Sequence, residues 1–256
     1  MVYSAIGTRH QQRGQPCQDY GSYRTEGVYL LGAVADGAGS AKHSEVGARI
    51  AVDSILDAIA LQIHDLESGT CEEMAEVAKT FFGQAFDALL NTLHREAEEM
   101  GCSLKDLGCT LLAFIAAPDW VAAMQVGDGF MVVRSSEEET YRLLFEPDKG
   151  EFINETIFVT TEGASESLRV YVQSSDRPFI CAATDGLERV AVRLQDWSPH
   201  GPFFGPFEAC LRQLPTPAER NLYLQTFLES ERLNAKTDDD KTLLACLYDL
   251  ELPESS

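Results

Sequence analysis

The stretch Val34-Ala35-Asp36-Gly37-Ala38-Gly39-Ser40 joins a hydrophobic segment to a polar turn and gives the first indication of the fold. The apolar run before Asp36, residues 28–35, has the length of a buried strand. Two glycines follow close behind the carboxylate, and a helical pattern begins near Ser44. A charge at the mouth of a buried strand needs a partner, and a bound cation is one candidate. The alternative is a strand-to-helix turn in which the aspartate is a local cap.

Composition limits the classes of protein to which the chain can belong. The chain has 256 residues, which is enough for one large domain or two small ones. A net charge of -21 argues against nucleic acid or an anionic membrane as a partner bound through a basic surface. No apolar run approaches the roughly 18 residues that a membrane-spanning helix needs.

Cysteine usage and the first residues indicate the compartment. The seven cysteines are widely spaced and form no C-x-x-C pair, which predicts free thiols and neither a zinc site nor a disulfide framework. The start, Met1 to Ala5, lacks the basic and apolar regions of a secretory signal. We therefore expect a cytoplasmic protein.

Three helices are predicted from apolar spacing and capping signals. The first runs from Ser44 to about residue 63, and the second opens at the capping box of Thr70 and stops at Gly101. A third, from 216 to about 233, starts with Thr216-Pro217-Ala218-Glu219. Prolines and glycines in 196–207 predict a surface excursion.

Strand signals dominate the rest of the chain. Four short runs, 109–116, 120–126, 130–133 and 141–145, are joined by tight turns and predict an antiparallel meander. Further strands are expected at 157–161, 168–172, 179–183 and 242–248. Together the elements predict one α+β domain over residues 1–256, with the first two helices on one sheet face and the third on the other.

Aspartates recur at the ends of these strands. Asp36, Asp128 and Asp185 end apolar runs and are each followed by glycine, Asp239 directly precedes the last strand, and Asp19 precedes an early one. Converging carboxylates suit Mg²⁺ or Mn²⁺. Two such ions about 3.5–4 Å apart can clamp a phosphoryl group and activate a water. The alternative is a chance scatter of turn-forming Asp-Gly pairs.

The order and spacing of these motifs resemble the metal-dependent (type 2C) serine/threonine protein phosphatases, above all their shorter bacterial members. The matching motifs span about residues 5–248 and are Gln18-Asp19, Asp36-Gly37-Ala38-Gly39, Gly108-Cys109-Thr110, Gly127-Asp128-Gly129, Thr184-Asp185-Gly186-Leu187 and Asp239-Asp240-Lys241-Thr242. The resemblance implies two packed antiparallel sheets flanked by helices. It also implies hydrolysis of phosphoserine or phosphothreonine by a water activated between two Mg²⁺ or Mn²⁺ ions.

The same resemblance implies roles for individual residues. Asp36 would bridge both metals, and the carbonyl of Gly37 would be a further ligand. Asp19 would lie close to the first metal, and Asp185 and Asp239 would hold the second. Asp128 would help to hold a third, weaker ion. Catalysis would thus depend on Asp36, Asp185 and Asp239, with a phosphorylated protein as substrate and a cognate serine/threonine kinase as a candidate partner.

The chain departs from the family pattern in three places. Gln18 replaces one member of an acidic pair, and Ala38 replaces the histidine proposed as general acid in many members. Gly14 stands where a phosphate-binding arginine is usual, so we expect Arg13, or failing that His10, to contact phosphate.

Some assignments stay open at this point. Asp238 and Asp240 are expected only to solvate their loop. A hydrolase of small phosphoesters, and a non-catalytic domain that binds phosphoproteins or a regulator, remain alternatives. The retained Asp36, Asp185 and Asp239 favour catalysis.

Overall fold

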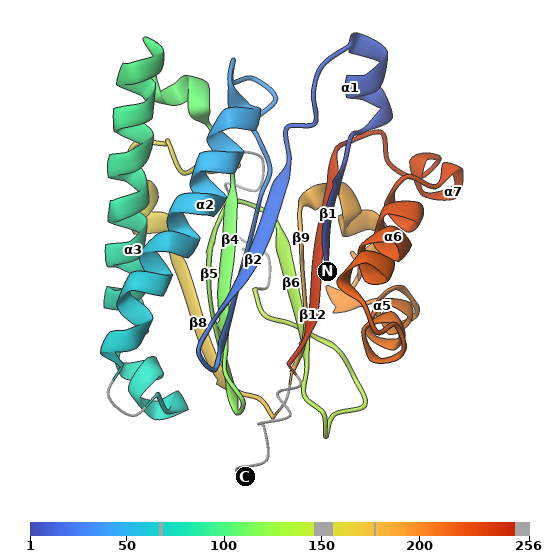
Figure 1. Cartoon of the computed structure of the whole chain (residues 1–256). Helices are drawn as coiled ribbons and strands as arrows, with labels where there is room; N and C mark the ends of the chain where they lie inside the picture. Colours follow the sequence, from blue (N-terminus) through green and yellow to red (C-terminus); the bar gives the residue numbers. More distant parts are fainter. Residues whose placement is uncertain (67–68, 146–155, 177, 249–256) are drawn as a thin grey trace.

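The computed structural model shows two antiparallel sheets that pack face to face, with helices outside both (Figure 1). It describes residues 1–66, 69–145, 156–176 and 178–248. This arrangement confirms the predicted fold class.

Each sheet has five strands. The first sheet has the order β2 (Tyr20–Glu26), β3 (Tyr29–Ala35), β4 (Leu111–Ala116), β5 (Trp120–Val126) and β8 (Arg169–Ser174). The second has the order β1 (Val2–Ala5), β12 (Lys241–Leu247), β9 (Phe179–Ala183), β6 (Phe130–Arg134) and β7 (Arg142–Leu143). A separate two-stranded ribbon pairs β10 (Val192–Arg193) with β11 (Ser198–Pro199).

The long helices cover the outer faces of the sheets. Helices α2 (Ser44–Gln62) and α3 (Cys71–Met100) lie on the first sheet, and α5 (Gly201–Gln213) and α6 (Pro217–Leu228) lie on the second (Figure 1). The short helices are α1 (Thr8–Arg13), α4 (Glu188–Ala191) and α7 (Glu231–Asn234), and the 3-10 turns are η1 (Ile63–Asp65), η2 (Leu104–Leu107), η3 (Ala164–Ser167) and η4 (Asp185–Leu187). No helix in the described part of the chain is both long and apolar enough to cross a membrane.

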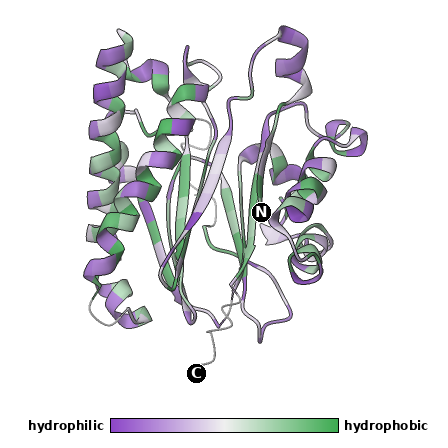
Figure 2. Cartoon of the chain, in the orientation of Figure 1, coloured by the Kyte–Doolittle hydropathy of each residue, from purple (hydrophilic) through white to green (hydrophobic). Residues whose placement is uncertain are grey.

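The central strands are largely apolar because both of their faces are buried, and the polar residues in them stand near their ends. In β3, Leu31 and Ala33 join the cluster under α2 and α3, whereas Val34 joins the cluster between the sheets. In β12, Leu243 faces the α5–α6 side and Leu244 faces the first sheet. Figure 2 shows the resulting pattern, with hydrophobic strands at the centre and mixed helices outside.

The predicted capping box forms completely at Thr216 and in part at Thr70, where the Glu73 side chain accepts the Gly69 amide at 2.7 Å. The Thr70 side chain accepts a hydrogen bond from the Glu73 amide, and Gly101 ends α3 with φ 66°. Thr216 and Glu219 form a reciprocal capping box at the start of α6. The third helix is nevertheless interrupted, because Ser230 caps a separate helix, α7. All seven cysteines are free, as predicted.

The predicted four-strand meander is wrong at its centre. Strands β4 and β5 pair, and so do β6 and β7, as predicted. However, β5 then pairs with β8, while β6 crosses to the second sheet and also pairs with β9. Gly127, with φ 103°, lies in the turn where the chain changes sheets. A tight turn between apolar runs is typical of a hairpin, but the sequence alone does not reveal to which sheet the next strand belongs.

The predicted surface excursion at 196–207 is also wrong. Residues 201–213 form α5, which has one proline near its start and another inside it. Phe203, Phe204 and Phe207 from this helix are buried against the second sheet. Burial of three aromatic rings outweighs the poor helix propensity of the prolines and glycines.

Two local predictions need smaller corrections. Residues 157–161 form a turn and no strand, in which Val159 is buried and its amide donates to the Cys109 carbonyl at 2.8 Å. Residues 8–13, for which no element was predicted, form α1. Residues 146–155, which precede this turn and whose structure the sequence left ambiguous, lie outside the described part of the chain.

Phe204→Ala should lower the free energy of unfolding by about 3–5 kcal/mol, because it removes a fully buried ring and leaves a cavity. Urea denaturation provides the measurement. Leu222→Ala, on the exposed face of α6, is the matched control and should change stability by no more than about 0.5 kcal/mol. A comparably small change for Phe204→Ala would show that α5 is peripheral to the core.

Candidate active site

Strand pairing brings four of the predicted aspartates to one edge of the sandwich. In antiparallel neighbours the end of one strand lies beside the start of the next. Tyr20 pairs with Ala35, so Asp19 and Asp36 are adjacent at the edge of the first sheet. Leu243 pairs with Ala183, which places Asp185 and the segment around Asp239 at the corresponding edge of the second sheet.

A hydroxyl group connects the two sheets at this edge. Thr184 Oγ1 donates to Asp19 Oδ2 at 2.6 Å and accepts the backbone N–H of Thr242 at 2.9 Å. Thr184 and Thr242 belong to the second sheet's edge, and Asp19 belongs to the first. The orientation of the Asp19 carboxylate is therefore fixed by the packing of one sheet on the other.

Backbone contacts hold Asp36 and Gly37 in place. The Asp36 amide donates to Thr110 Oγ1 at 3.0 Å, and the Thr110 amide donates back to the Asp36 carbonyl at 2.8 Å. The Gly37 amide donates to the Gln18 carbonyl at 3.2 Å. A Cβ at Gly37 would lie 2.7 Å from that same carbonyl oxygen and 2.8 Å from Ser44 Cβ, so only glycine fits this close approach.

The carboxylates are mutually repulsive and partly desolvated. Burial, and then the charges of Asp19 and Asp185, raise the pKa of Asp36 far above its usual range. Burial also raises the pKa of Asp19 to about 7 and that of Asp185 to about 6, with contributions from neighbouring carboxylates. Asp36 affects the pKa of both, and their charges raise its own, so these three groups titrate together.

This edge has the chemistry of a site for hard divalent cations. Asp19 Oδ1 is buried without a hydrogen-bond partner, and so are Gln18 Oε1 and Ser44 Oγ beside Gly37. Such groups normally find a partner, and a cation or its bound water would satisfy them and relieve the repulsion. Within the described residues, no three acidic, imidazole or thiol side chains already converge as a complete ligand set. The donor set therefore fits Mg²⁺ or Mn²⁺ in its chemistry, and the ligand assignments stay predictions.

Asp128 lies in the turn where β5 passes to β6 and thus between the two sheets. Thr156 Oγ1 donates to Asp128 Oδ2 at 2.7 Å. The charge of Asp128 contributes to the raised pKa of both Asp36 and Asp185. Its predicted role at a weaker third ion stays a prediction.

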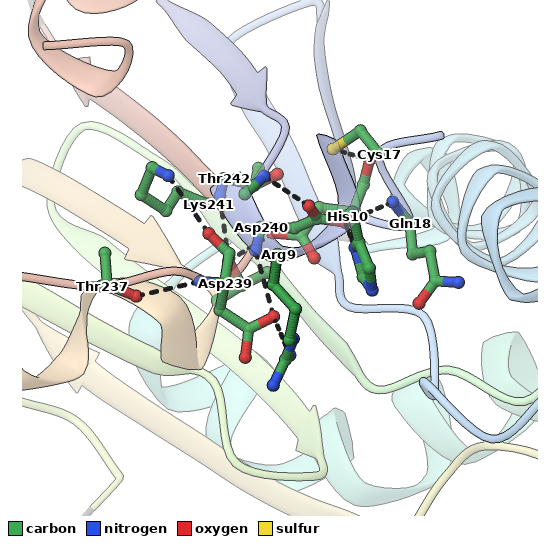
Figure 3. Close-up of polar contacts among 12 residues, drawn as sticks. Arg9, His10, Cys17, Gln18, Thr237, Asp239, Asp240, Lys241 and Thr242 are labelled. Atoms are coloured by element: carbon green, nitrogen blue, oxygen red, sulfur yellow. Dashed lines mark hydrogen bonds and ion pairs between the residues drawn. The ribbon is translucent and has the colours of Figure 1, made fainter. Parts of the chain in front are cut away.

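The sequence predicted that Asp240 only solvates its loop, and the structure shows that this prediction is wrong. Asp240 is only 3% exposed, and its carboxylate accepts the backbone N–H groups of Gly7 and Gln18, each at 2.6 Å. His10 Nδ1 lies 2.9 Å from Asp240 Oδ2 (Figure 3). Asp240 thus fastens α1 and the Gln18-Asp19 segment to the start of β12.

The environment of His10 also argues against its predicted role as a phosphate ligand. The His10 ring is buried and one nitrogen is engaged by Asp240, so the side chain faces the interior. Arg13, at the end of α1, is exposed, and its contact with phosphate stays a prediction. A different cation reaches the site: Arg9 Nη2 donates to Asp239 Oδ1 at 2.7 Å (Figure 3).

Sequence reasoning missed three residues of this site. Arg9 and Asp240 depend on where α1 docks, and α1 was not predicted. Thr184 stands in a motif that the sequence did single out, but its bond to Asp19 crosses between residues 165 positions apart. Asp240 likewise stands in the quoted motif Asp239-Asp240-Lys241-Thr242, but that motif did not indicate its contacts with Gly7, His10 and Gln18.

Comparisons with known proteins identify the family of the chain. The family model described as "Protein phosphatase 2C" matches residues 6–229, a range that ends before Asp239. The chain is 34% identical to "Serine/threonine-protein phosphatase 3" of Escherichia coli (strain K12) over 259 aligned residues, which cover 97% of this chain and 98% of the relative.

Solved structures share the fold at low sequence identity. A bacterial serine phosphatase superposes with a TM-score of 0.64 at 14% identity, covering 97% of both chains. A serine/threonine phosphatase from Staphylococcus aureus gives a TM-score of 0.62 at 15% identity, covering 98% of this chain and 94% of the other. From the extent of the family match and the Escherichia coli relative, the chain belongs to the protein phosphatase 2C family.

Proposed function

We propose that the protein is a metal-dependent phosphatase that hydrolyses phosphoserine and phosphothreonine in other proteins. Membership of the phosphatase 2C family and the 34% identical serine/threonine-protein phosphatase support this activity. The observation that carries the proposal is the buried group of carboxylates around Asp36, in which Asp19 Oδ1 has no partner. Such crowding is costly unless a cation binds there.

Each aspartate of the edge has a proposed place in the metal site. Asp36 would contact two cations, with the Gly37 carbonyl as an additional ligand, and Asp19 would serve the first cation. Asp185 and Asp239 would hold the second, and Asp128 a third, weaker one. When bound, the two core ions would supply a nucleophilic water and neutralise charge on the phosphoryl group.

The protein's own residues would hold the metal-binding side chains and backbone in fixed orientations. Thr184 holds one oxygen of Asp19 and leaves the other free. Gly37 lets its backbone lie against Ser44 without steric conflict. Ala38 offers no acidic proton in the turn after Asp36, so the leaving serine or threonine oxygen would take its proton from another donor.

The proposed substrate is a phosphorylated protein, and a serine/threonine kinase that acts on the same substrate is a candidate partner. The free cysteines suit a reducing environment, and we propose the cytoplasm as the site of action.

Hydrolysis of a phosphothreonine peptide should require added Mn²⁺ or Mg²⁺ and should stop with chelator, because oxygen ligands alone line the site. Phosphate release is the measurement, with small-molecule phosphomonoesters assayed in parallel. Full turnover in chelator-treated protein would contradict the metal mechanism. Hydrolysis of small esters only would point to a different phosphohydrolase.

Asp36→Asn, Asp185→Asn and Asp239→Asn should each lower turnover by about 100-fold or more, since each removes a proposed metal ligand. Asp238→Asn, which alters the exposed neighbour of Asp239, is the matched control and should retain turnover. Asp128→Asn should leave two tight Mn²⁺ sites in calorimetry but raise the metal concentration needed for half-maximal rate. A wild-type rate for any of the first three variants would exclude that residue from the site.

Metal-free protein should lose stability as the pH rises from about 4 to 7. Unfolded aspartates titrate near pH 4, whereas the pKa is about 6 for Asp185 and about 7 for Asp19 in the folded protein. In this window the folded state binds more protons than the unfolded state, so the free energy of unfolding falls with rising pH, by several kcal/mol.

Urea denaturation in chelator at several pH values measures this effect, and Mn²⁺ should reduce or reverse the trend because metal displaces the protons. Asp185→Asn should flatten the metal-free profile. An identical pH profile for Asp185→Asn and wild type would show that Asp185 does not titrate as proposed.

A further inference from the structure

Arg9 places a positive charge on a proposed metal ligand. Its guanidinium donates to Asp239 Oδ1 at 2.7 Å, and the two side chains are 42% and 38% exposed. Among the ion pairs of the described residues, this one reaches a carboxylate assigned to a cation. Figure 3 shows Arg9 directed toward Asp239 from α1.

The position of Arg9 is set by a buried framework. Its own amide donates to the Asp238 carbonyl at 3.0 Å, and the adjacent His10 is buried against Asp240. Asp240 also binds the Gly7 amide at the start of α1, where a Cβ would lie 2.3 Å from the Asp239 backbone. Because α1 is fixed on both sides of Arg9, the backbone of Arg9 is held beside Asp239, and the ion pair to Asp239 is what positions the guanidinium there.

The ion pair opposes the proposed metal site. A divalent cation on Asp239 and a guanidinium on the same carboxylate are like charges at short range, and they repel each other. Arg9 already occupies one of the two carboxylate oxygens, so a cation would have to share the ligand or displace the arginine. Arg9 therefore lowers the affinity of this cation site as long as it has no other anion to bind.

A phosphoryl group provides such an anion. Its oxygens match the planar donor fork of arginine, which binds phosphate in a bidentate manner more readily than lysine does. A phosphoryl group at the metal edge would draw Arg9 away from Asp239 and release that carboxylate for the cation.

We propose that Arg9 is shared between Asp239 and the substrate phosphoryl group and thereby couples binding at the second cation site to binding of substrate. This inference rests on the proposed function. The coupling is reciprocal: phosphoryl binding tightens the cation, and the cation frees Arg9 for the phosphoryl group. Arg9 thus takes the phosphate-contacting role that the sequence predicted for Arg13 or His10.

Calorimetric titration with Mn²⁺, with and without phenylphosphonate, tests the coupling. This probe resembles a phosphomonoester but has a carbon–phosphorus bond that is not hydrolysed. Arg9→Ala should bind Mn²⁺ at the weaker core site about two- to fivefold more tightly than wild type without the probe, the range expected of an exposed ion pair. It should gain less Mn²⁺ affinity from phenylphosphonate than wild type gains.

Three further variants sharpen the result. Arg24→Ala, which breaks the exposed Arg24–Asp57 ion pair of the same 2.7 Å length, is the matched control and should behave like wild type in both titrations. Arg13→Ala, one helical turn away from Arg9, tests the alternative phosphoryl contact. Arg9→Lys keeps the charge but loses the planar fork, so it should keep the weak Mn²⁺ affinity and lose most of the coupling. Circular dichroism should confirm that each variant is folded.

The possible outcomes separate this inference from the proposed function. If Arg9→Ala matches wild type in both titrations while wild type hydrolyses phosphopeptide with Mn²⁺, the coupling is wrong and the function stands. Loss of coupling in Arg13→Ala alone would assign the phosphoryl contact to Arg13. Failure of wild-type protein to bind Mn²⁺ would overturn both proposals.

Discussion

Repulsion among buried carboxylates is the constraint on which the rest of the structure depends. Asp19, Asp36 and Asp185 come from strand ends of two different sheets, and burial together with neighbouring carboxylates raises the pKa of each. Only a rigid scaffold can hold like charges together in a partly desolvated place. The sandwich supplies that rigidity through a dry core between the sheets and helices on both outer faces.

The scaffold is reinforced where the charges meet. Thr184 joins the sheets by its bond to Asp19, and Asp240 joins α1, the Gln18 backbone and the start of β12. Lys241, fully buried, adds bonds to Asn234 and to the Asp239 carbonyl. In the sequence Asp239-Asp240-Lys241, the carboxylate of Asp239 thus belongs to the proposed site. The carboxylate of Asp240 binds the backbone of Gly7 and Gln18, and the ammonium of Lys241 binds the carbonyl of Asp239.

The net charge of -21 limits where on the protein a phosphorylated substrate can be attracted. An acidic surface repels a phosphorylated protein, so a phosphatase of this composition needs positive charge at the site itself. Bound cations and Arg9 would provide it, and their shared dependence on Asp239 explains why the same residue matters for metal and for substrate. Electrostatic attraction would then be confined to the edge where the chemistry takes place.

The sequence by itself determined the periodic elements and the chemistry of the site. Apolar runs, capping boxes at Thr70 and Thr216, and aspartates at strand ends are local patterns whose physical meaning does not depend on distant residues. The tertiary structure decided the rest. The departure of β6 to the second sheet, the burial of the phenylalanines of α5, the framework role of Asp240 and the reach of Arg9 to Asp239 all arise from contacts between segments far apart in the chain. Such contacts leave no periodic trace in the sequence, because packing of the whole chain fixes which distant partners meet.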